Sequence, residues 1–316
     1  MLLERIQQNA SLLAKHPAYR CGEEFLTYSQ LWNAACLLAA QLQDGAGAVA
    51  LIGTKQPMMA VGMLGSLLAG RPYLPLSSDQ PKERLQRILS QANPGTVIDC
   101  REAKAEQWLK REPATQNFLI PGDPSRDAYW LFTSGSSGSP KGVRISLAAL
   151  ENFVRWFCAL PAIRSRKEPG AALNQAQFSF DLSVADLWPA WMMGETVFAL
   201  EPSQQADLDK LYRALGESGA TRMSCTPSFA RLCLCDKSFQ RELMPALQTV
   251  FFCGETLPAR TVRQLRQRFP GVTVLNAYGP TEATCAVCAV EVTGAGEPLP
   301  VGQLENTACQ LLILDR

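Results

Sequence analysis

The chain has 316 residues, of which 47% are hydrophobic, so it is long enough to form one large or two medium-sized α/β domains with substantial cores. Its 30 Lys and Arg residues nearly balance 29 Asp and Glu residues, and the net charge of +1 gives no positive field for nucleic acid or an anionic membrane. The N-terminus lacks a signal-peptide hydrophobic region, and the apolar stretch at 190–200 is interrupted and too short to span a bilayer, so we expect a cytoplasmic protein.

The first hundred residues alternate between helix-like and strand-like segments. Residues 1–45 predict two helices around a short hairpin, with Thr27 as the N-cap of the second helix. The following segments predict strands at 48–53, 73–76 and 96–99 and helices at 57–68 and 81–91. This order predicts a mostly parallel sheet with helices on both faces.

Residues 100–126 are polar and contain several prolines, which indicates a connection between two parts of the chain. We therefore expect a first α/β subdomain at 1–125 and a second at 126–316. The alternation resumes in the second part, with strands expected at 222–225, 249–253 and 273–276 and helices at 208–217, 229–234 and 259–268.

The most informative segment is residues 131–146, Leu-Phe-Thr-Ser-Gly-Ser-Ser-Gly-Ser-Pro-Lys-Gly-Val-Arg-Ile-Ser. A strand-like approach opens into small or hydroxylated residues, whose backbone N–H groups can surround an anion, and Lys141 adds a positive charge. It differs from the common P-loop, because Lys141 follows Pro140 and precedes a strand-like stretch instead of a helix. The segment predicts nucleotide-phosphate binding, with a flexible linker as the alternative.

The cysteines and the single histidine narrow the chemistry. Without a secretion signal the 11 cysteines are not expected to form disulfides, and the pair Cys285 and Cys288 lacks a second ligand pair for zinc. We expect buried structural cysteines, with a zinc or redox protein as a distant alternative. Because His16 is the only histidine, Ser-His-Asp or Cys-His catalysis is not expected.

Four further segments, at 68–76, 178–186, 251–256 and 275–284, fall where strands of this alternation meet loops. Together with the segment 131–146, they make the chain resemble an adenylation domain of the acyl-adenylate-forming superfamily, most closely the D-alanine–D-alanyl carrier protein ligase type and nonribosomal peptide synthetase modules. The resemblance runs from about residue 25 to the end of the sequence. It implies an α/β fold with two stacked, mixed or parallel sheets flanked by helices.

The resemblance also implies a site for ATP and Mg²⁺. The expected catalytic residues are Lys141, Thr281 and Glu282, with Thr281 bonding the α-phosphate and Glu282 holding Mg²⁺, while Tyr278 would stack on adenine. Charge builds on the α-phosphate during carboxylate attack, and a metal with hydroxyl donors stabilises it. The full set of implied nucleotide-binding residues is Thr133, Ser134, Gly135, Ser136, Ser137, Gly138, Lys141, Gly254, Glu255, Asn276, Ala277, Tyr278, Gly279, Pro280 and Thr281.

Asp181 matches the acid that binds the substrate α-ammonium group in amino-acid-activating members of the superfamily. The alternative is a structural role as a helix N-cap. The implied amino-acid pocket consists of Leu182, Ala185, Ser224, Phe251, Cys253, Ala277, Cys285 and Ala286. Several of these residues replace bulkier ones of the D-alanine ligases, which implies a roomier or more polar pocket. One methylene is worth only about 1–3 kcal/mol of discrimination, so another small amino acid stays open.

The resemblance thus implies ATP-dependent activation of a small amino acid, D-alanine or similar, as an aminoacyl-adenylate, with release of pyrophosphate and transfer to the phosphopantetheine thiol of a carrier protein. The alternatives are an acyl- or aryl-CoA-type ligase of the same fold and a nucleotide- or amino-acid-binding core without full activity. The superfamily also has a Thr-Gly-Asp segment and a mobile C-terminal domain with a catalytic lysine, for which the sequence holds no candidate. We therefore expect a truncated adenylation core, with the third subdomain absent and carrier-protein interaction impaired.

Overall fold

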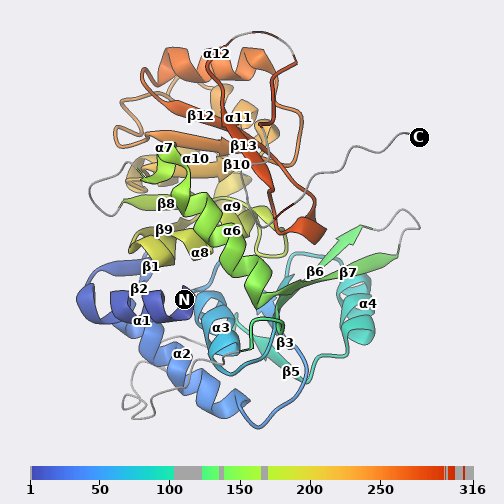
Figure 1. Ribbon diagram of the computed structural model, residues 1–316. Helices are drawn as coiled ribbons and strands as arrows, with labels where there is room; N and C mark the ends of the chain where they lie inside the picture. The colour runs from blue at the N-terminus through green and yellow to red at the C-terminus, as the bar shows by residue number, and fades with distance from the viewer. Residues whose placement is uncertain are drawn as a thin grey trace.

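Two sheets form the framework of the computed structural model, which describes residues 2–102, 123–134, 139–164, 170–294, 296, 298–302 and 309 (Figure 1). The smaller sheet has the strand order β5-β3-β4-β6-β7. Its strands pair in parallel except for the antiparallel hairpin of β6 and β7. These strands are β3 (Val49–Gly53), β4 (Tyr73–Ser77), β5 (Thr96–Asp99), β6 (Asp127–Ser134) and β7 (Pro140–Ser146).

Helices cover both faces of this sheet, as the β-α-β order predicts. Every residue of α3 (Pro57–Leu68) is buried, because this apolar helix lies between the sheet and α2 (Tyr28–Leu42). On the opposite face, α4 (Lys82–Ala92) packs Ile88 into a small cluster with the outward residues of β3 and β4. The N-cap predicted at Thr27 is confirmed, and it is part of a capping box, since Thr27 Oγ1 accepts from Gln30 N at 3.2 Å and Gln30 Oε1 accepts from Thr27 N at 2.9 Å.

The larger sheet has eight strands in the order β13-β12-β11-β10-β8-β9-β1-β2. Its pairs are parallel except at its two ends, where β1–β2 and β12–β13 are antiparallel. The strands are β1 (Pro17–Cys21), β2 (Glu24–Thr27), β8 (Ala171–Asn174), β9 (Thr196–Ala199), β10 (Arg222–Cys225), β11 (Thr249–Phe252), β12 (Thr273–Tyr278) and β13 (Cys288–Glu291).

The main core lies between the two sheets, where α6 (Leu147–Ala159) and α8 (Leu182–Met193) pack against each other. A second core lies under the outer helices, α10 (Leu208–Glu217), α11 (Pro227–Leu234) and α12 (Ala259–Arg268). Shorter or terminal helices complete the described elements: α1 (Leu2–Leu12), α7 (Pro161–Arg164), α9 (Pro202–Gln205) and the 3₁₀ turn η1 (Thr281–Ala283). The prediction of two sheets flanked by helices is therefore confirmed.

The sheets do not separate at residue 125. Strands β1 and β2 from the start of the chain belong to the larger sheet, whereas β6 and β7 from beyond residue 125 belong to the smaller one. Each sheet therefore takes strands from both expected subdomains, and the division into 1–125 and 126–316 stays a prediction. Most of the expected connection at 100–126 lies outside the described residues.

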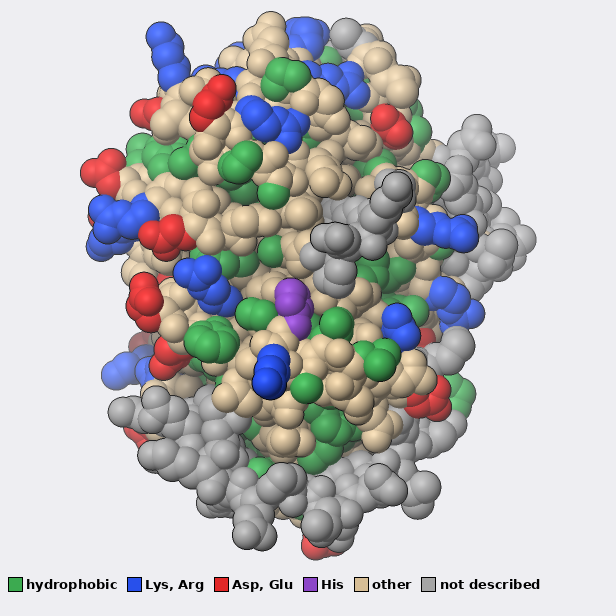
Figure 2. Space-filling view, turned by 90° about the vertical axis from the view of Figure 1, so that its left-hand side faces the viewer, with side chains coloured by type: hydrophobic (Ala, Val, Ile, Leu, Met, Phe, Trp, Pro, Cys, Tyr) green, Lys and Arg blue, Asp and Glu red, His purple; other side chains and the backbone are tan. Residues whose placement is uncertain are grey.

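The cysteines are free thiols, and eight of the 11 are buried, which agrees with a structural role. Cys235 is an exception and is exposed. Two residues beyond the buried Cys233, the helical period turns Cys235 to the opposite face of the helix. Within the described residues no helix is both long and apolar enough to cross a membrane. On the face shown in Figure 2, basic and acidic side chains are interspersed instead of forming a patch of one sign.

Candidate functional site

Asp181 and Thr281 meet although they are 100 residues apart. Thr281 Oγ1 donates a hydrogen bond of 2.6 Å to Asp181 Oδ2. Asp181 occupies the N-cap position of α8, but its side chain makes no capping hydrogen bond to that helix. Burial raises the pKa of the Asp181 carboxyl, and the hydrogen bond from Thr281 opposes this rise. The geometry thus directs the carboxylate toward Thr281 and does not support the N-cap alternative.

A hollow of about 200 Å³ lies beside this pair, and its walls come from the end of β6, from α4 and the turn before it, and from the segments around Asp181 and Thr281. Thr133 from the end of β6 lines it together with Asp181 and Thr281. Leu131, Phe132, Ser179 and Phe180 also line it and lie in the segments that the sequence analysis singled out, whereas Gln80 and Arg84 were not predicted. The sequence holds one signal for Arg84, which is its place in the first turn of α4. A cation is locally unfavourable there because it opposes the helix dipole, so a binding role could explain it.

Lys141 and Glu282 form a second contact at the site, which joins the β6–β7 hairpin to η1. Their Nζ and Oε1 atoms are 2.7 Å apart, and both side chains are more than half exposed. Lys141 stands opposite Thr133 in the β6–β7 hairpin, while Glu282 lies in η1. The hydrogen bond from Lys141 lowers the pKa of Glu282. Gly135, Ser136, Ser137, Gly138 and the side chain of Ser134 lie outside the described residues.

The end of β12 carries the expected adenine site. The Tyr278 side chain is 56% exposed, unusual for an aromatic ring at a strand end, and so is free to stack on a ligand. The next position requires glycine, because a β-carbon on Gly279 would lie 2.5 Å from Ala286 Cα. Asn276 is buried and donates from Nδ2 to the Pro300 carbonyl at 2.7 Å, which leaves its Oδ1 and its second N–H for other contacts.

Two other expected nucleotide contacts lie at the end of β11. Gly254 has a positive φ of 96°, a backbone conformation that favours glycine. Glu255 accepts hydrogen bonds from the backbone N and the hydroxyl of Ser228, at 3.1 and 2.6 Å. Glu255 therefore anchors the start of α11, and its predicted role in nucleotide binding stays untested.

The eight residues predicted to form the amino-acid pocket are all buried, with at most 6% of any of them exposed. Seven belong to the main core, and Ser224 on β10 is the register partner of Phe251 on β11. Cys253 Sγ lies 3.6 Å from the Cys285 carbonyl oxygen. The backbone is strained here, because Thr284 and Cys285 both have positive φ, at 64° and 70°. The structure thus places these residues in or next to the main core, and their role as an amino-acid pocket stays a prediction.

Nothing in the described residues forms a metal site from protein ligands alone, since no group of three or more His, Cys, Asp and Glu side chains could hold an ion. Mg²⁺ in nucleotide sites is commonly held by one or two carboxylates together with phosphate oxygens. The exposed Glu282 beside Lys141 fits that pattern. The site can therefore take a metal that arrives with a nucleotide.

Sequence comparisons agree with this geometry. The model of the AMP-binding enzyme family matches residues 6–316. The D-alanine–D-alanyl carrier protein ligase of Bacillus licheniformis is 37% identical over 336 residues, covering 99% of this chain and 66% of that protein. The ligase of the same name from Bacillus velezensis is 36% identical over 322 residues, covering 95% of this chain and 63% of that protein. The chain spans about two thirds of the length of these relatives.

Solved structures share the fold. The nonribosomal peptide synthetase FmoA3 in its AMPPNP-bound form superposes with a TM-score of 0.83 at 21% identity, over 97% of this chain and 34% of that one. The N-terminal subdomain of Klebsiella oxytoca NpsA, in complex with 3-hydroxyanthranilyl-AMSN, gives a TM-score of 0.78 at 20% identity, over 93% of this chain and 76% of that one. The family match and the identity to the ligases together place this chain in the AMP-binding enzyme family.

Proposed function

We propose that this chain is the core of an enzyme that activates a small amino acid, D-alanine or a similar one, as an aminoacyl-adenylate. The observation that carries the proposal is the contact of Asp181 with Thr281. It places a carboxylate, suited to an α-ammonium group, next to a hydroxyl suited to an α-phosphate. The names of the Bacillus relatives support an amino acid as the substrate and a carrier protein as the acceptor.

The reaction needs positioning and charge stabilisation more than proton transfer. An oxygen of the substrate carboxylate attacks the α-phosphorus of ATP, and the bond between that phosphorus and the bridging oxygen breaks to release pyrophosphate. The nucleophile is already ionised, so no general base is required, in agreement with a chain that has one histidine. Thr281 would donate to the α-phosphate, where negative charge accumulates.

Lys141 and Glu282 would give up their ion pair when the nucleotide binds, and each would take a different role. When Mg-ATP binds, the Lys141 ammonium would turn to the β- and γ-phosphates, and Glu282 would hold the metal. Bound Mg²⁺ supplies neutralisation of phosphate charge. Because both side chains are exposed, exchanging the ion pair for ligand contacts costs little.

The test is amino-acid-dependent exchange of labelled pyrophosphate into ATP, screened with both enantiomers of the common amino acids and with carboxylic acids that lack an amino group. We expect exchange with small amino acids, D-alanine or a close analogue among them. Exchange only with acids that lack the amino group would refute the amino-acid assignment and favour an acyl or aryl ligase. ATP binding without exchange for any acid would favour a binding core.

A further inference from the structure

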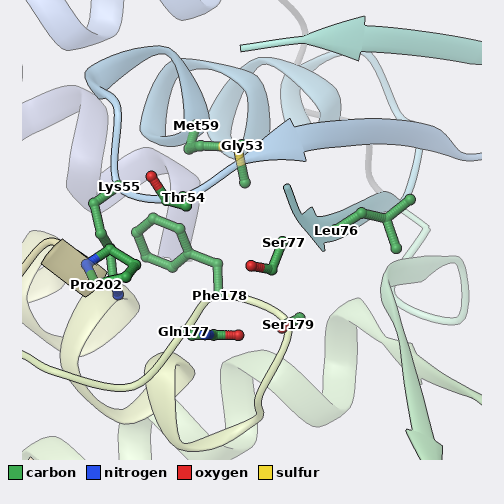
Figure 3. A pocket seen from close by; sticks show the side chains of 10 residues that line it. All are labelled: Gly53, Thr54, Lys55, Met59, Leu76, Ser77, Gln177, Phe178, Ser179 and Pro202. Carbon is green, nitrogen blue, oxygen red and sulfur yellow. The ribbon is translucent and has the colours of Figure 1, made fainter. Parts of the chain in front are cut away.

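Lys55 is a buried cation that the proposed reaction does not use. It follows β3 in the smaller sheet, and only 1% of it is exposed. The surrounding hollow has a volume of about 10 Å³, at the lower limit for a single water molecule (Figure 3). An ammonium group buried without bulk water is unfavourable unless protein groups satisfy its donors. The contacts of Lys55 therefore need an explanation.

Within the described residues, the hydrogen bonds and the ring contact of the Lys55 ammonium lie on one segment of the chain, residues 174–178. Nζ donates to Asn174 Oδ1 and, at 2.5 Å, to the Ala176 carbonyl. It also lies 4.1 Å from the centre of the Phe178 ring, a cation–π contact visible in Figure 3. The backbone of Lys55 is fixed in turn, because Tyr19 donates to its carbonyl at 2.8 Å.

This segment leads directly to Asp181. Asn174 ends β8 of the larger sheet, and the chain runs from there through Phe178 to the N-terminus of α8. Lys55 follows β3 of the smaller sheet and thus ties that strand to the loop that leads from β8 of the larger sheet to Asp181. In the described residues between β8 and Asp181, Gln175 makes a second anchor, because its Nε2 donates to Gln205 Oε1 at 2.9 Å.

A chain of polar groups continues beyond Lys55 into the core. Asn174 Nδ2 donates to Asp186 Oδ2 at 3.4 Å, and Asp186 lies 3.7 Å from Arg222. Arg222 pairs with Glu195 at 2.8 Å. Burial lowers the pKa of Lys55 to about 7 and raises that of Asp186 to about 7. The ammonium form of Lys55 is therefore close to losing its proton at neutral pH.

We propose that the Lys55 ammonium is a positioning residue, which holds the loop 174–181 so that Asp181 faces the amino group of the substrate. This inference rests on the proposed function, since it takes Asp181 as the ammonium ligand. Lys55 does not touch the substrate and acts through the Ala176 carbonyl and the Phe178 ring. Its loss should weaken amino-acid binding, because a displaced Asp181 carboxylate loses good geometry for its charge-assisted hydrogen bond to the substrate ammonium group.

The test replaces Lys55 by methionine, which is of similar length but uncharged, and uses the exposed Lys237→Met as the matched control. Calorimetry measures the affinity for a non-hydrolysable ATP analogue and then the affinity of that complex for D-alanine and for the best substrate of the exchange screen. We expect Lys55→Met to weaken amino-acid binding by about 10-fold or more, as for the loss of one hydrogen bond to a charged group. Affinity for the ATP analogue should stay unchanged, and Lys237→Met should match the wild type.

The pH dependence of amino-acid affinity adds a measurement that would not change if Lys55 had only a structural role. Wild-type affinity for the amino acid should fall as pH rises through about 7, because Lys55 then loses its proton. The charged or titratable groups facing Lys55 are Asp186, Cys21 and Glu201, and each favours its ammonium form when ionised. Asp186→Asn should therefore move the fall to lower pH. In Lys55→Met the fall should be absent.

The outcomes separate the two proposals. A wild-type protein that binds no amino acid refutes the proposed function and this inference together. Wild-type binding with an unchanged affinity in Lys55→Met refutes the inference alone, as does an equal loss of affinity for the nucleotide and the amino acid. If Lys55→Met does not fold, the wild-type pH series decides, and a flat profile through neutral pH overturns the role of Lys55.

Discussion

Replacing Asp181 by asparagine tests the ammonium site with little change of shape. Asparagine keeps an oxygen that can accept the 2.6 Å hydrogen bond from Thr281, so the local structure should persist. What is lost is the negative charge that faces the substrate α-ammonium. Removing one partner of a buried, hydrogen-bonded charge pair costs about 2–5 kcal/mol. Since Asp181 is only half-buried, we take the lower end, about 2 kcal/mol, or about a 30-fold loss of affinity.

The assay is calorimetric titration of the amino acid into the complex with a non-hydrolysable ATP analogue, with the exposed Asp209→Asn as the control. Nucleotide affinity should survive in both variants. The pKa of Asp181 is raised by burial, so wild-type affinity should fall as pH drops through that raised pKa, and Asp181→Asn should lose this dependence. Unchanged amino-acid affinity in Asp181→Asn would refute the assignment of Asp181 as the ligand of the substrate ammonium group.

Three further predictions concern Glu282, Gly279 and the buried ion pair of Arg222 with Glu195. Glu282→Gln should abolish the gain in ATP affinity that Mg²⁺ provides and leave the melting temperature unchanged, because the side chain is exposed; calorimetry with and without Mg²⁺ checks this, and an undiminished gain would contradict it. Gly279→Ala should destabilise the fold by about 1–3 kcal/mol in urea unfolding, since the added carbon meets Ala286 at 2.5 Å; a neutral result would show that the turn can move. Arg222→Met should lower the free energy of unfolding by about 3–5 kcal/mol, because the buried Glu195 loses the guanidinium that pairs with it. Adding Glu195→Gln should recover part of this loss. An Arg222→Met variant as stable as the wild type in urea unfolding would contradict the prediction.

Local sequence patterns predicted most of the helices and strands. The bounds of α3, α10, α12, β5 and β10 match the expected ranges. Local signals mark some of them, since Pro57 occupies the first position of α3 and Asp207 caps α10. The pairing of distant strands was not predictable in this way. Nothing in the local sequence of β1 or β6 shows which sheet each strand joins, since that choice depends on contacts far away in the chain.

The candidate site divides along the same line. Tyr278, Thr281 and Asp181 were predicted because their types and spacing match a family pattern, and the structure brings Asp181 and Thr281 into contact. Arg84 at the hollow and the buried Lys55 were not predicted. A lysine in a polar stretch between a strand and a helix usually indicates a solvated turn, and only the packing of the second sheet over Lys55 makes it buried.

Titration with a pair of non-hydrolysable adenylate mimics tests the central claim most directly. One mimic carries a D-alanyl group and the other a propionyl group, so they differ only in the amino group that Asp181 is proposed to bind. We expect the D-alanyl mimic to bind at least about 30-fold more tightly, and Asp181→Asn to remove the difference. Equal affinity of the wild-type protein for the two mimics would contradict the assignment of this chain to amino-acid activation.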